Sequence, residues 1–153
     1  MTLKVVLVNP QIPPNTGNIA RSCAATATEL HLVGPLGFEI SDRHLKRAGL
    51  DYWPYVDLHH HLSWENFLEF YPTVGGRLLG YSVRGAQNYA QFQYQKGDWL
   101  VFGSETQGLP REVLQLCDTT LNIPIDSQKV RSLNLSVSVA IGLFEARRQL
   151  YYT

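Results

Sequence analysis

The sequence has few cysteines, no long hydrophobic run and no excess of either charge. Its two cysteines, Cys23 and Cys117, form no CxxC motif and no disulfide framework, so we interpret both as reduced, small apolar residues. No apolar run reaches the ~18 residues that a membrane-spanning helix needs. The apolar run 5–8 near the start is too short for a signal peptide and has no cleavage site after it. We therefore expect a cytoplasmic protein.

The charge balance gives no general indication of a nucleic-acid partner. Lysine and arginine total 13, and aspartate and glutamate also total 13. A strongly basic chain would point to nucleic acid by itself, whereas here any RNA contact must come from local basic patches. Hydrophobic residues make up 44% of the chain and charged residues 17%, as in a globular protein. A length of 153 residues predicts one domain over 1–153.

Short apolar runs typical of buried strands alternate with helical patterns along the whole chain. The predicted strands are 3–8, 30–33, 56–58, 77–82, 99–102 and 120–125. The predicted helices are 19–27, 41–50, 63–68, 110–117 and 133–151, the first of them after a stiff, proline-rich loop at 9–15. This alternation predicts an α/β fold, a mainly parallel sheet with helices on both faces.

Ligands of such folds bind at the carboxyl ends of the strands, so the polar loops that follow strands are candidates for one shared site. These loops are 9–18, 81–85, 103–109 and 126–132.

Two of these loops are weak signals when each is considered alone. In Gly103-Ser-Glu-Thr-Gln-Gly-Leu-Pro110 two glycines bracket Glu105, but the loop is neither a Walker motif nor a dinucleotide fingerprint. It could be only a tight turn that follows a strand. In the segment 123–136 the polar residues Arg131, Ser132, Asn134 and Ser136 stand where a helix begins, and they could serve only to cap it.

Three segments taken together are more specific than any one of them. The segments 15–21 (NTGNIAR), 102–110 (FGSETQGLP) and 123–136 (IPI followed by RSLNLS) resemble, in this order, the signature motifs of the SPOUT methyltransferases. The resemblance covers nearly the whole chain. The opening NPQIPPNTGN and the segment 45–52 (LKRAGLDY) resemble the bacterial tRNA wobble-nucleotide 2′-O-methyltransferases within that superfamily.

The resemblance implies a sheet whose C-terminal part is tied in a trefoil knot, a homodimer, and S-adenosyl-L-methionine as methyl donor. Pattern reasoning alone would predict against a knot, because true knots are rare. Carried over by position, the implied cofactor-binding residues are Tyr81, Gly103, Ile123, Ser132 and Leu133. Tyr81 departs from the aliphatic residue expected at its position.

The implied catalytic set is Asn15, Arg21, Glu105, Ser132 and Asn134. A guanidinium stays protonated in proteins, so we expect Arg21 to orient the ribose hydroxyl and stabilise negative charge rather than act as a base. Asn15 and Asn134 would help to orient the hydroxyl. Glu105 would position its loop or Arg21, and a purely structural loop carboxylate is an equal alternative.

Basic residues on the predicted helix 41–50 are the first candidates for RNA contact. Arg43, Lys46 and Arg47 are spaced i, i+3 and i+4, so they share one face, and Arg84 is the next candidate. An ordinary solvated face is the alternative. The run His59-His60-His61 has no nearby ligands at zinc spacing, and we interpret it as a solvated loop without a metal.

The function that these resemblances imply is methyl transfer from S-adenosyl-L-methionine to the 2′-hydroxyl of the tRNA wobble nucleotide, a cytidine or modified uridine in the anticodon stem-loop. One alternative is the same chemistry at another tRNA or rRNA position. The other is a non-catalytic RNA-binding protein built on this fold.

Overall fold

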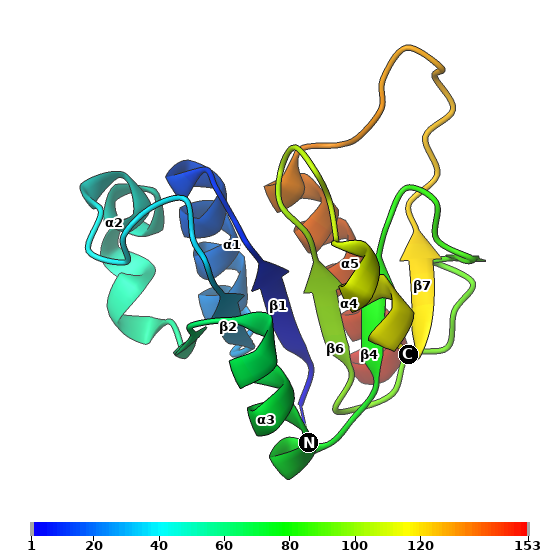
Figure 1. The fold of residues 1–153 in the computed structure, drawn as a ribbon, viewed down its shortest axis with the longest axis horizontal. Helices are drawn as coiled ribbons and strands as arrows, with labels where there is room; N and C mark the ends of the chain where they lie inside the picture. The colour runs from blue at the N-terminus through cyan, green and yellow to red at the C-terminus, as the bar shows by residue number, and fades with distance from the viewer. Residues whose placement is uncertain (1, 153) are drawn as a thin grey trace.

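A parallel sheet forms the centre of the molecule (Figure 1). The computed structural model describes residues 2–152, except for the side chains at positions 44, 46, 49 and 50. Within them the strands are β1 (Lys4–Val8), β2 (Glu29–Val33), β3 (Leu58–His61), β4 (Leu78–Tyr81), β5 (Gln87–Asn88), β6 (Trp99–Phe102) and β7 (Thr119–Asn122). Their order is β3-β2-β1-β6-β4-β7-β5, and every neighbouring pair is parallel. The predicted parallel α/β sheet is confirmed.

Helices cover both faces of this sheet. They are α1 (Pro13–Ala25), α2 (Arg43–Gly49), the 3₁₀ helix η1 (Leu50–Tyr55), α3 (Trp64–Val74), α4 (Arg111–Leu116) and α5 (Leu135–Tyr151). Side chains alternate along a strand, so β1 contributes to two separate cores. Val5 and Leu7 pack with residues of α1 and α5, whereas Val6 and Val8 pack with residues of α3 and α4. The predicted helices on both faces are confirmed (Figure 1).

Several predicted boundaries are wrong: the helix predicted over 63–68 runs to Val74, the strand predicted over 120–125 ends at Asn122, and two further differences affect the interpretation. The first helix begins at Pro13 and not near Ile19, because proline fits the first turn of a helix, where its missing N–H is not needed. The third strand is 58–61 and not 56–58, so the three histidines lie in an edge strand and not in a solvated loop. Parallel pairing with the apolar strand β2 holds them there.

The last helix packs closely on the carboxyl end of β4. Its buried residues include Leu135, Val139 and Leu143, at helical spacing. A Cβ on Gly142 would lie 2.9 Å from the ring of Tyr81, so only glycine permits this approach. The Tyr81 ring in turn stacks on Phe102 of β6, with ring centroids 4.3 Å apart. Helix α5 therefore supports the two strands at the point where their polar loops begin.

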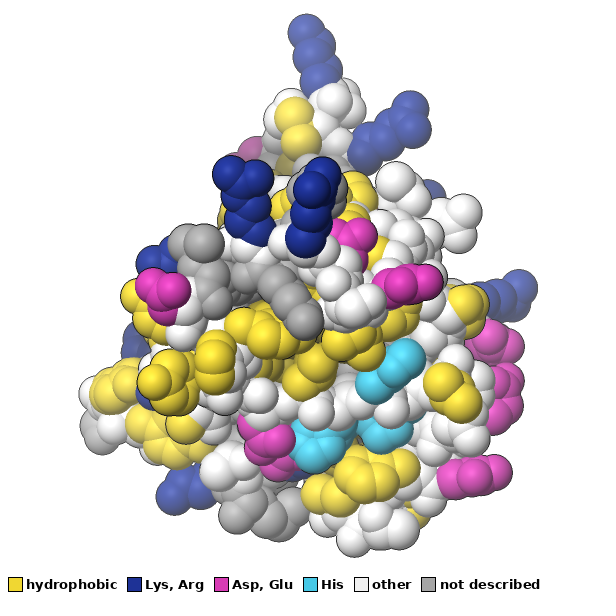
Figure 2. Space-filling model, turned by 90° about the vertical axis from the view of Figure 1, so that its left-hand side faces the viewer, with side chains coloured by type: hydrophobic (Ala, Val, Ile, Leu, Met, Phe, Trp, Pro, Cys, Tyr) yellow, Lys and Arg dark blue, Asp and Glu magenta, His cyan; other side chains and the backbone are white. Residues whose placement is uncertain are grey.

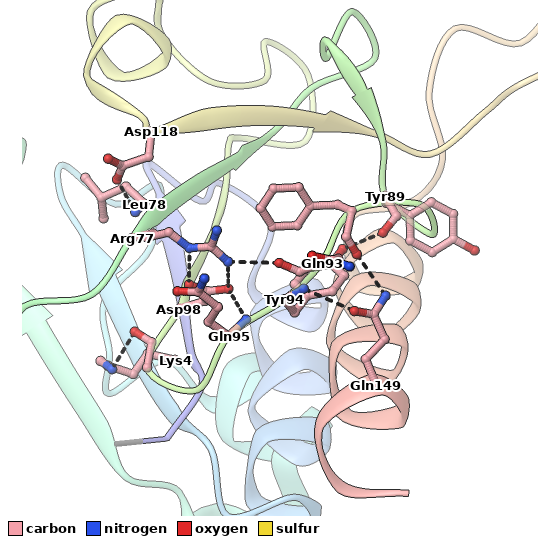
Figure 3. A network of polar contacts seen from close by, with 12 residues as sticks. Lys4, Arg77, Leu78, Tyr89, Gln93, Tyr94, Gln95, Asp98, Asp118 and Gln149 are labelled. Atoms are coloured by element: carbon pink, nitrogen blue, oxygen red, sulfur yellow. Dashed lines mark hydrogen bonds and ion pairs between the residues drawn. The ribbon is translucent and has the colours of Figure 1, made fainter. Parts of the chain in front are cut away.

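A polar network ties the segment before β6 to β4 and to α5 (Figure 3). The Asp98 carboxylate is 1% exposed and accepts two hydrogen bonds from Arg77, at 2.9 and 2.7 Å, and one from the backbone N–H of Gln95. These bonds raise the pKa of Arg77. On the other side, the Gln149 side chain accepts from the backbone N–H of Tyr94 and donates to the carbonyl of Phe92.

Replacing Asp98 by alanine is expected to lower the free energy of unfolding by about 2–4 kcal/mol, because it leaves a half-buried guanidinium and a backbone N–H without their acceptor. Urea unfolding measures the change. The matched control is Asp126→Ala, at an exposed carboxylate, with an expected change of no more than about 0.5 kcal/mol. Equal stability of both variants would contradict this account of the network.

The two cysteines are free thiols, as predicted. Cys23 is buried and Cys117 is partly buried, and burial raises the pKa of both to about 12, so both are protonated at neutral pH. Among the residues that the structure describes, no helix has the length and apolar character needed to cross a membrane.

Candidate active site

A cavity of about 310 Å³ opens at the carboxyl ends of β4, β6 and β7. Three of the four loops predicted to share a site contribute to it. Its lining is made by Tyr81, Ser82, Val83, the segment 102–109, Leu121, Ile123, Ile125, Arg131, Ser132, Leu133, Leu135 and Ser138. A few polar groups on mostly apolar walls are typical of a small-molecule site of this size.

All five residues that the sequence predicts for cofactor binding line this cavity: Tyr81, Gly103, Ile123, Ser132 and Leu133. Tyr81 is 7% exposed, and its hydroxyl lies 2.7 Å from that of Tyr94. Burial raises the pKa of both hydroxyls, so both stay protonated. With its hydroxyl engaged there, Tyr81 offers its ring to the cavity, the apolar part that an aliphatic residue would supply.

The glycines at the two ends of the 103–108 loop are required by the conformation of the loop's own backbone. A Cβ on Gly103 would lie 2.0 Å from the carbonyl carbon of Gly108 and 2.2 Å from the nitrogen of Leu109. Gly108 has a φ of +68°, which favours glycine. Two backbone hydrogen bonds between Ser104 and Gly108 close the loop, at 3.3 and 3.0 Å. The closed loop presents Leu109 as an apolar wall of the cavity.

Glu105 fastens this loop to the segment that enters α1. Its carboxylate accepts from the backbone N–H groups of Gln11 at 2.9 Å and Ile12 at 2.8 Å, and from the side-chain amide of Asn15 at 3.4 Å. Charge-assisted bonds to two successive backbone groups fix one loop relative to the other. These contacts fit positioning of the loop, and they fit the alternative of a purely structural loop carboxylate equally well.

The predicted residues Asn15 and Asn134 are brought together from the two ends of the chain. The side-chain amide of Asn134 donates to the Asn15 oxygen at 3.1 Å. The Asn134 oxygen accepts from the backbone N–H groups of Ser136 and Val137, which makes Asn134 the N-cap of α5. A continuous hydrogen-bonded line thus runs from Glu105 through Asn15 to Asn134 and joins the 103–108 loop to the first turn of α1 and the start of α5.

Arg21 lies apart from this line. It is exposed on α1, and its guanidinium stacks over the Tyr52 ring of η1 at 4.8 Å from the ring centroid. It is not among the described residues that line the cavity. The fifth predicted catalytic residue, Ser132, does line it. Of the five predicted catalytic residues, Glu105 and Ser132 line the cavity, and Asn15 and Asn134 are joined to Glu105 by hydrogen bonds, whereas Arg21 does neither.

The predicted RNA-contact residues lie outside the cavity. Arg43 and Arg47 are exposed and stand one turn apart on α2, beside α1. The side chain of Lys46, between them, is outside the described residues. Arg84 is exposed in the turn after β4.

Sequence reasoning did not single out Arg131 as a site residue. Its side chain contributes to the cavity lining next to Ser132, in an exposed loop. The available signal was its place at the start of the third motif, where we interpreted it as part of a helix cap. A permanently charged group at the cavity edge is suited to an anionic partner.

Comparison with known proteins gives the family. A model of the SpoU rRNA methylase family matches residues 2–144. This chain belongs to that family. The resemblance inferred from the three motifs is therefore confirmed, and the cavity lies within the region that the SpoU model matches.

Relatives and solved structures agree with the SpoU assignment. A Synechocystis protein named putative tRNA (cytidine(34)-2′-O)-methyltransferase is 64% identical over 148 residues, which cover 97% of each chain. A structure described by its authors as insight into 2-OH methylation of C/U34 on tRNA has a TM-score of 0.94 and 49% identity, and the match covers 99% of this chain and 98% of that one. The SpoU methyltransferase AviRb of Streptomyces viridochromogenes, solved with AdoMet, has a TM-score of 0.89 and 26% identity, over 97% of this chain and 57% of AviRb.

Proposed function

We propose that this SpoU-family chain transfers a methyl group from S-adenosylmethionine to the ribose 2′-hydroxyl of nucleotide 34, the wobble nucleotide of tRNA. The observation that carries the proposal is the cavity itself. It is lined by all five predicted cofactor residues, in a chain that aligns almost end to end with relatives named for this reaction. We place the reaction in the cytoplasm and the catalytic machinery in a single domain over residues 1–153.

The cavity suits S-adenosylmethionine by its lining of apolar walls and backbone groups. Leu109, Ile123 and Leu133 offer apolar walls to the adenine ring, and the backbone around Gly103 offers hydrogen-bonding groups at the rim. The cofactor supplies an electrophilic methyl group on a sulfonium. Because this positive charge disappears as the new bond forms, apolar walls do not oppose the transfer.

The remaining requirements are orientation of the ribose hydroxyl and removal of its proton. The Asn15 and Asn134 side chains are already hydrogen-bonded to each other and to Glu105 or α5, so they act by holding the loops in place. Ser132 lines the cavity and can reach the bound donor or the hydroxyl. Arg21 remains protonated, orients the hydroxyl and the adjacent phosphate, and stabilises the developing alkoxide, while the hydroxyl proton is released to solvent water.

A homodimer is part of this proposal. Val137, Phe144 and Tyr151 recur every seventh residue on α5, and they are 47%, 47% and 39% exposed. Side chains seven residues apart share one helix face, so they form an apolar stripe open to solvent. A second copy that covers the stripe also approaches α1, which packs beside α5 and carries Arg21. Sedimentation equilibrium would then give about twice the chain mass of 17.3 kDa.

A trefoil knot in the C-terminal part is also proposed. Two close approaches support it: a Cβ on Gly85 would lie 2.3 Å from the backbone of Leu121, and Gln149 bonds the backbone of the segment 92–94. The segment between β4 and β6 therefore contacts both β7 and the end of α5. An experimental structure in which the chain is traced continuously from 77 to 151 tests the knot. It would show whether the C-terminal segment passes through the loop made by the segment between β4 and β6.

The basic face of α2 is proposed to contact the backbone of the anticodon stem-loop. Each phosphate contact by an exposed arginine releases counterions. In the variant Arg43→Ala/Arg47→Ala, the slope of log affinity against log salt is expected to become shallower by roughly 1.4–1.8, which corresponds to two lost phosphate contacts. Filter binding of tRNA at several salt concentrations measures the slope.

The matched control for the basic face is Lys96→Ala, an exposed cation near the amino end of β6, at the opposite edge of the sheet from the cavity. We expect it to leave the slope unchanged. A double variant with the original slope and affinity would assign these arginines to an ordinary solvated helix face.

The reaction itself is tested by incubation of the protein with methyl-labelled S-adenosylmethionine and total tRNA, either unmodified or native, followed by nucleoside mapping. Label in a 2′-O-methylated wobble nucleotide supports the proposal. Label elsewhere in tRNA keeps the chemistry and overturns the target, and cofactor binding without label on either tRNA pool points to rRNA as the substrate. No label and no cofactor binding would favour a non-catalytic RNA-binding protein.

A further inference from the structure

A cluster of metal-binding side chain types lies at the amino ends of β2 and β3, away from the active-site cavity. Glu29, His31 and His59 each offer one ligand atom, and these atoms lie within 4.8 Å of one another. Figure 2 shows histidine and acidic side chains side by side on this face of the molecule. None of these residues has a role in the proposed methyl transfer.

The parallel pairing of β2 with β3 explains how the cluster forms. Residues two apart on a strand share a face, so Glu29 and His31 of β2 point the same way. His59 pairs with His31 across the ladder, and their rings stack with centroids 4.4 Å apart. Asp57 is two residues before His59, and its carboxylate oxygen lies 2.9 Å from His59 Nε2.

The distances suit one small divalent ion. His31 Nε2 is 3.0 Å and His59 Nε2 is 3.5 Å from the same Glu29 oxygen. Zinc bonds of 2.0–2.2 Å in a tetrahedral site put neighbouring ligand atoms about 3.3–3.6 Å apart. The 3.5 Å separation lies in that range, the 3.0 Å separation is shorter, and all three ligand atoms lie within 4.8 Å of one another, so an ion can enter with side-chain movements.

The surroundings also favour metal ligation. His31 is fully buried, and its Nε2 faces the Glu29 carboxylate. Its other ring nitrogen, Nδ1, lies 2.9 Å from His61 Nε2, the kind of outer contact that orients a ligating histidine. His59 Nε2 is buried without a hydrogen bond of good geometry, although the Asp57 oxygen is close.

Charge and access are compatible with a divalent cation. The Glu29 and His59 side chains are 32% and 36% exposed, so an ion can enter from solvent. The ammonium of Lys4 acts on His31 and opposes a cation, but it donates to the carbonyls of Thr2 and Gly97, and two carboxylates outweigh it.

We propose that Glu29, His31 and His59 form a three-ligand binding site for zinc or a similar divalent transition-metal ion, with its remaining position open to solvent. The ion would fasten the edge strand β3 to β2 and so stabilise the free edge of the sheet. Its role is structural, because its ligands are at the amino ends of strands whose carboxyl ends face the substrate side. The sequence expectation of a chain without a metal is replaced by this proposal.

The test uses the full chain, stripped with a chelator, and Zn²⁺ alone as the probe. Calorimetric titration is expected to give one Zn²⁺ per chain. Zn²⁺ at 100 times its dissociation constant is expected to raise the unfolding midpoint by roughly 5 °C or more. Neither readout depends on methyl transfer, so the result is separate from that of the proposed function.

Variants make the assignment specific. His59 and Glu29 are both partly exposed, so His59→Asn and Glu29→Gln are expected to fold. Each substitution removes one ligand and is expected to weaken Zn²⁺ binding at least 10-fold. The matched control is His60→Asn, on the same strand but the opposite face and exposed, with unchanged binding expected. No binding by the unmodified chain, or equal binding by the His59→Asn and His60→Asn variants, would overturn the site.

Discussion

Replacement of Arg21 by alanine is expected to lower the rate of methyl transfer by about 100-fold or more, while the affinity for S-adenosylmethionine stays unchanged. Arg21 is exposed on α1 and is not part of the described cavity lining, so its loss should not disturb the cofactor. What is lost is a permanent positive charge with a planar set of donors, held in place by the Tyr52 ring. Single-turnover labelling of tRNA and calorimetry with the cofactor measure the two quantities.

Two further variants separate the charge of Arg21 from its orientation. Arg21→Lys keeps the charge without the guanidinium fork, so it should recover only part of the rate. Tyr52→Phe keeps the ring under Arg21 and should stay close to the original rate. Full turnover by Arg21→Ala with normal cofactor binding would refute the role given to Arg21.

Replacement of Gly103 by alanine is expected to weaken S-adenosylmethionine binding by more than about 10-fold, because the added methyl cannot fit and the wall of the cavity must move. The new Cβ would lie 2.0–2.3 Å from backbone atoms of Gly108 and Leu109, which cannot rotate away as a side chain would. The 103–108 loop must then open, and Leu109 is displaced from the cavity. Calorimetric titration with the cofactor measures the effect.

The control for Gly103 is Gly108→Ala at the other end of the same loop. No atom lies within 4 Å of a Cβ built there, so its cost is limited to the positive φ, about 1 kcal/mol. Gly108→Ala should therefore bind the cofactor more tightly than Gly103→Ala does. Urea unfolding of both variants checks that each is folded, and unaltered binding by folded Gly103→Ala would contradict the steric account.

The sequence predicts β1 and β6 at the middle of the sheet well, because these strands are continuous apolar runs covered on both faces. Lys4–Val8 and Trp99–Phe102 stand where the pattern places them. The strand order could not be derived, since the neighbouring positions of β1 and β6 depend on contacts almost a hundred residues apart. The strand 58–61 was missed because its sequence does not alternate between apolar and polar residues. Its two histidines on one face, His59 and His61, instead stack their rings on His31.

The cofactor residues were predicted from motif resemblance and then found around one cavity, but the reasons for some of them required the structure. The contact of Asn134 with Asn15 joins residues 119 apart, which no local pattern can indicate. The need for glycine at position 103 comes from the loop's own backbone and not from a ligand. The placement of Arg21 outside the cavity also depends on packing of α1 against η1.

The most direct test of the central claim uses two synthetic anticodon stem-loops that differ only at nucleotide 34, one with ribose and one with 2′-deoxyribose. Each is incubated with the protein and methyl-labelled S-adenosylmethionine. We predict label in the ribose form alone, recovered as a 2′-O-methylated nucleotide 34. Equal labelling of both forms would show that the methyl group goes to another nucleotide or to a base, and would contradict the proposed reaction.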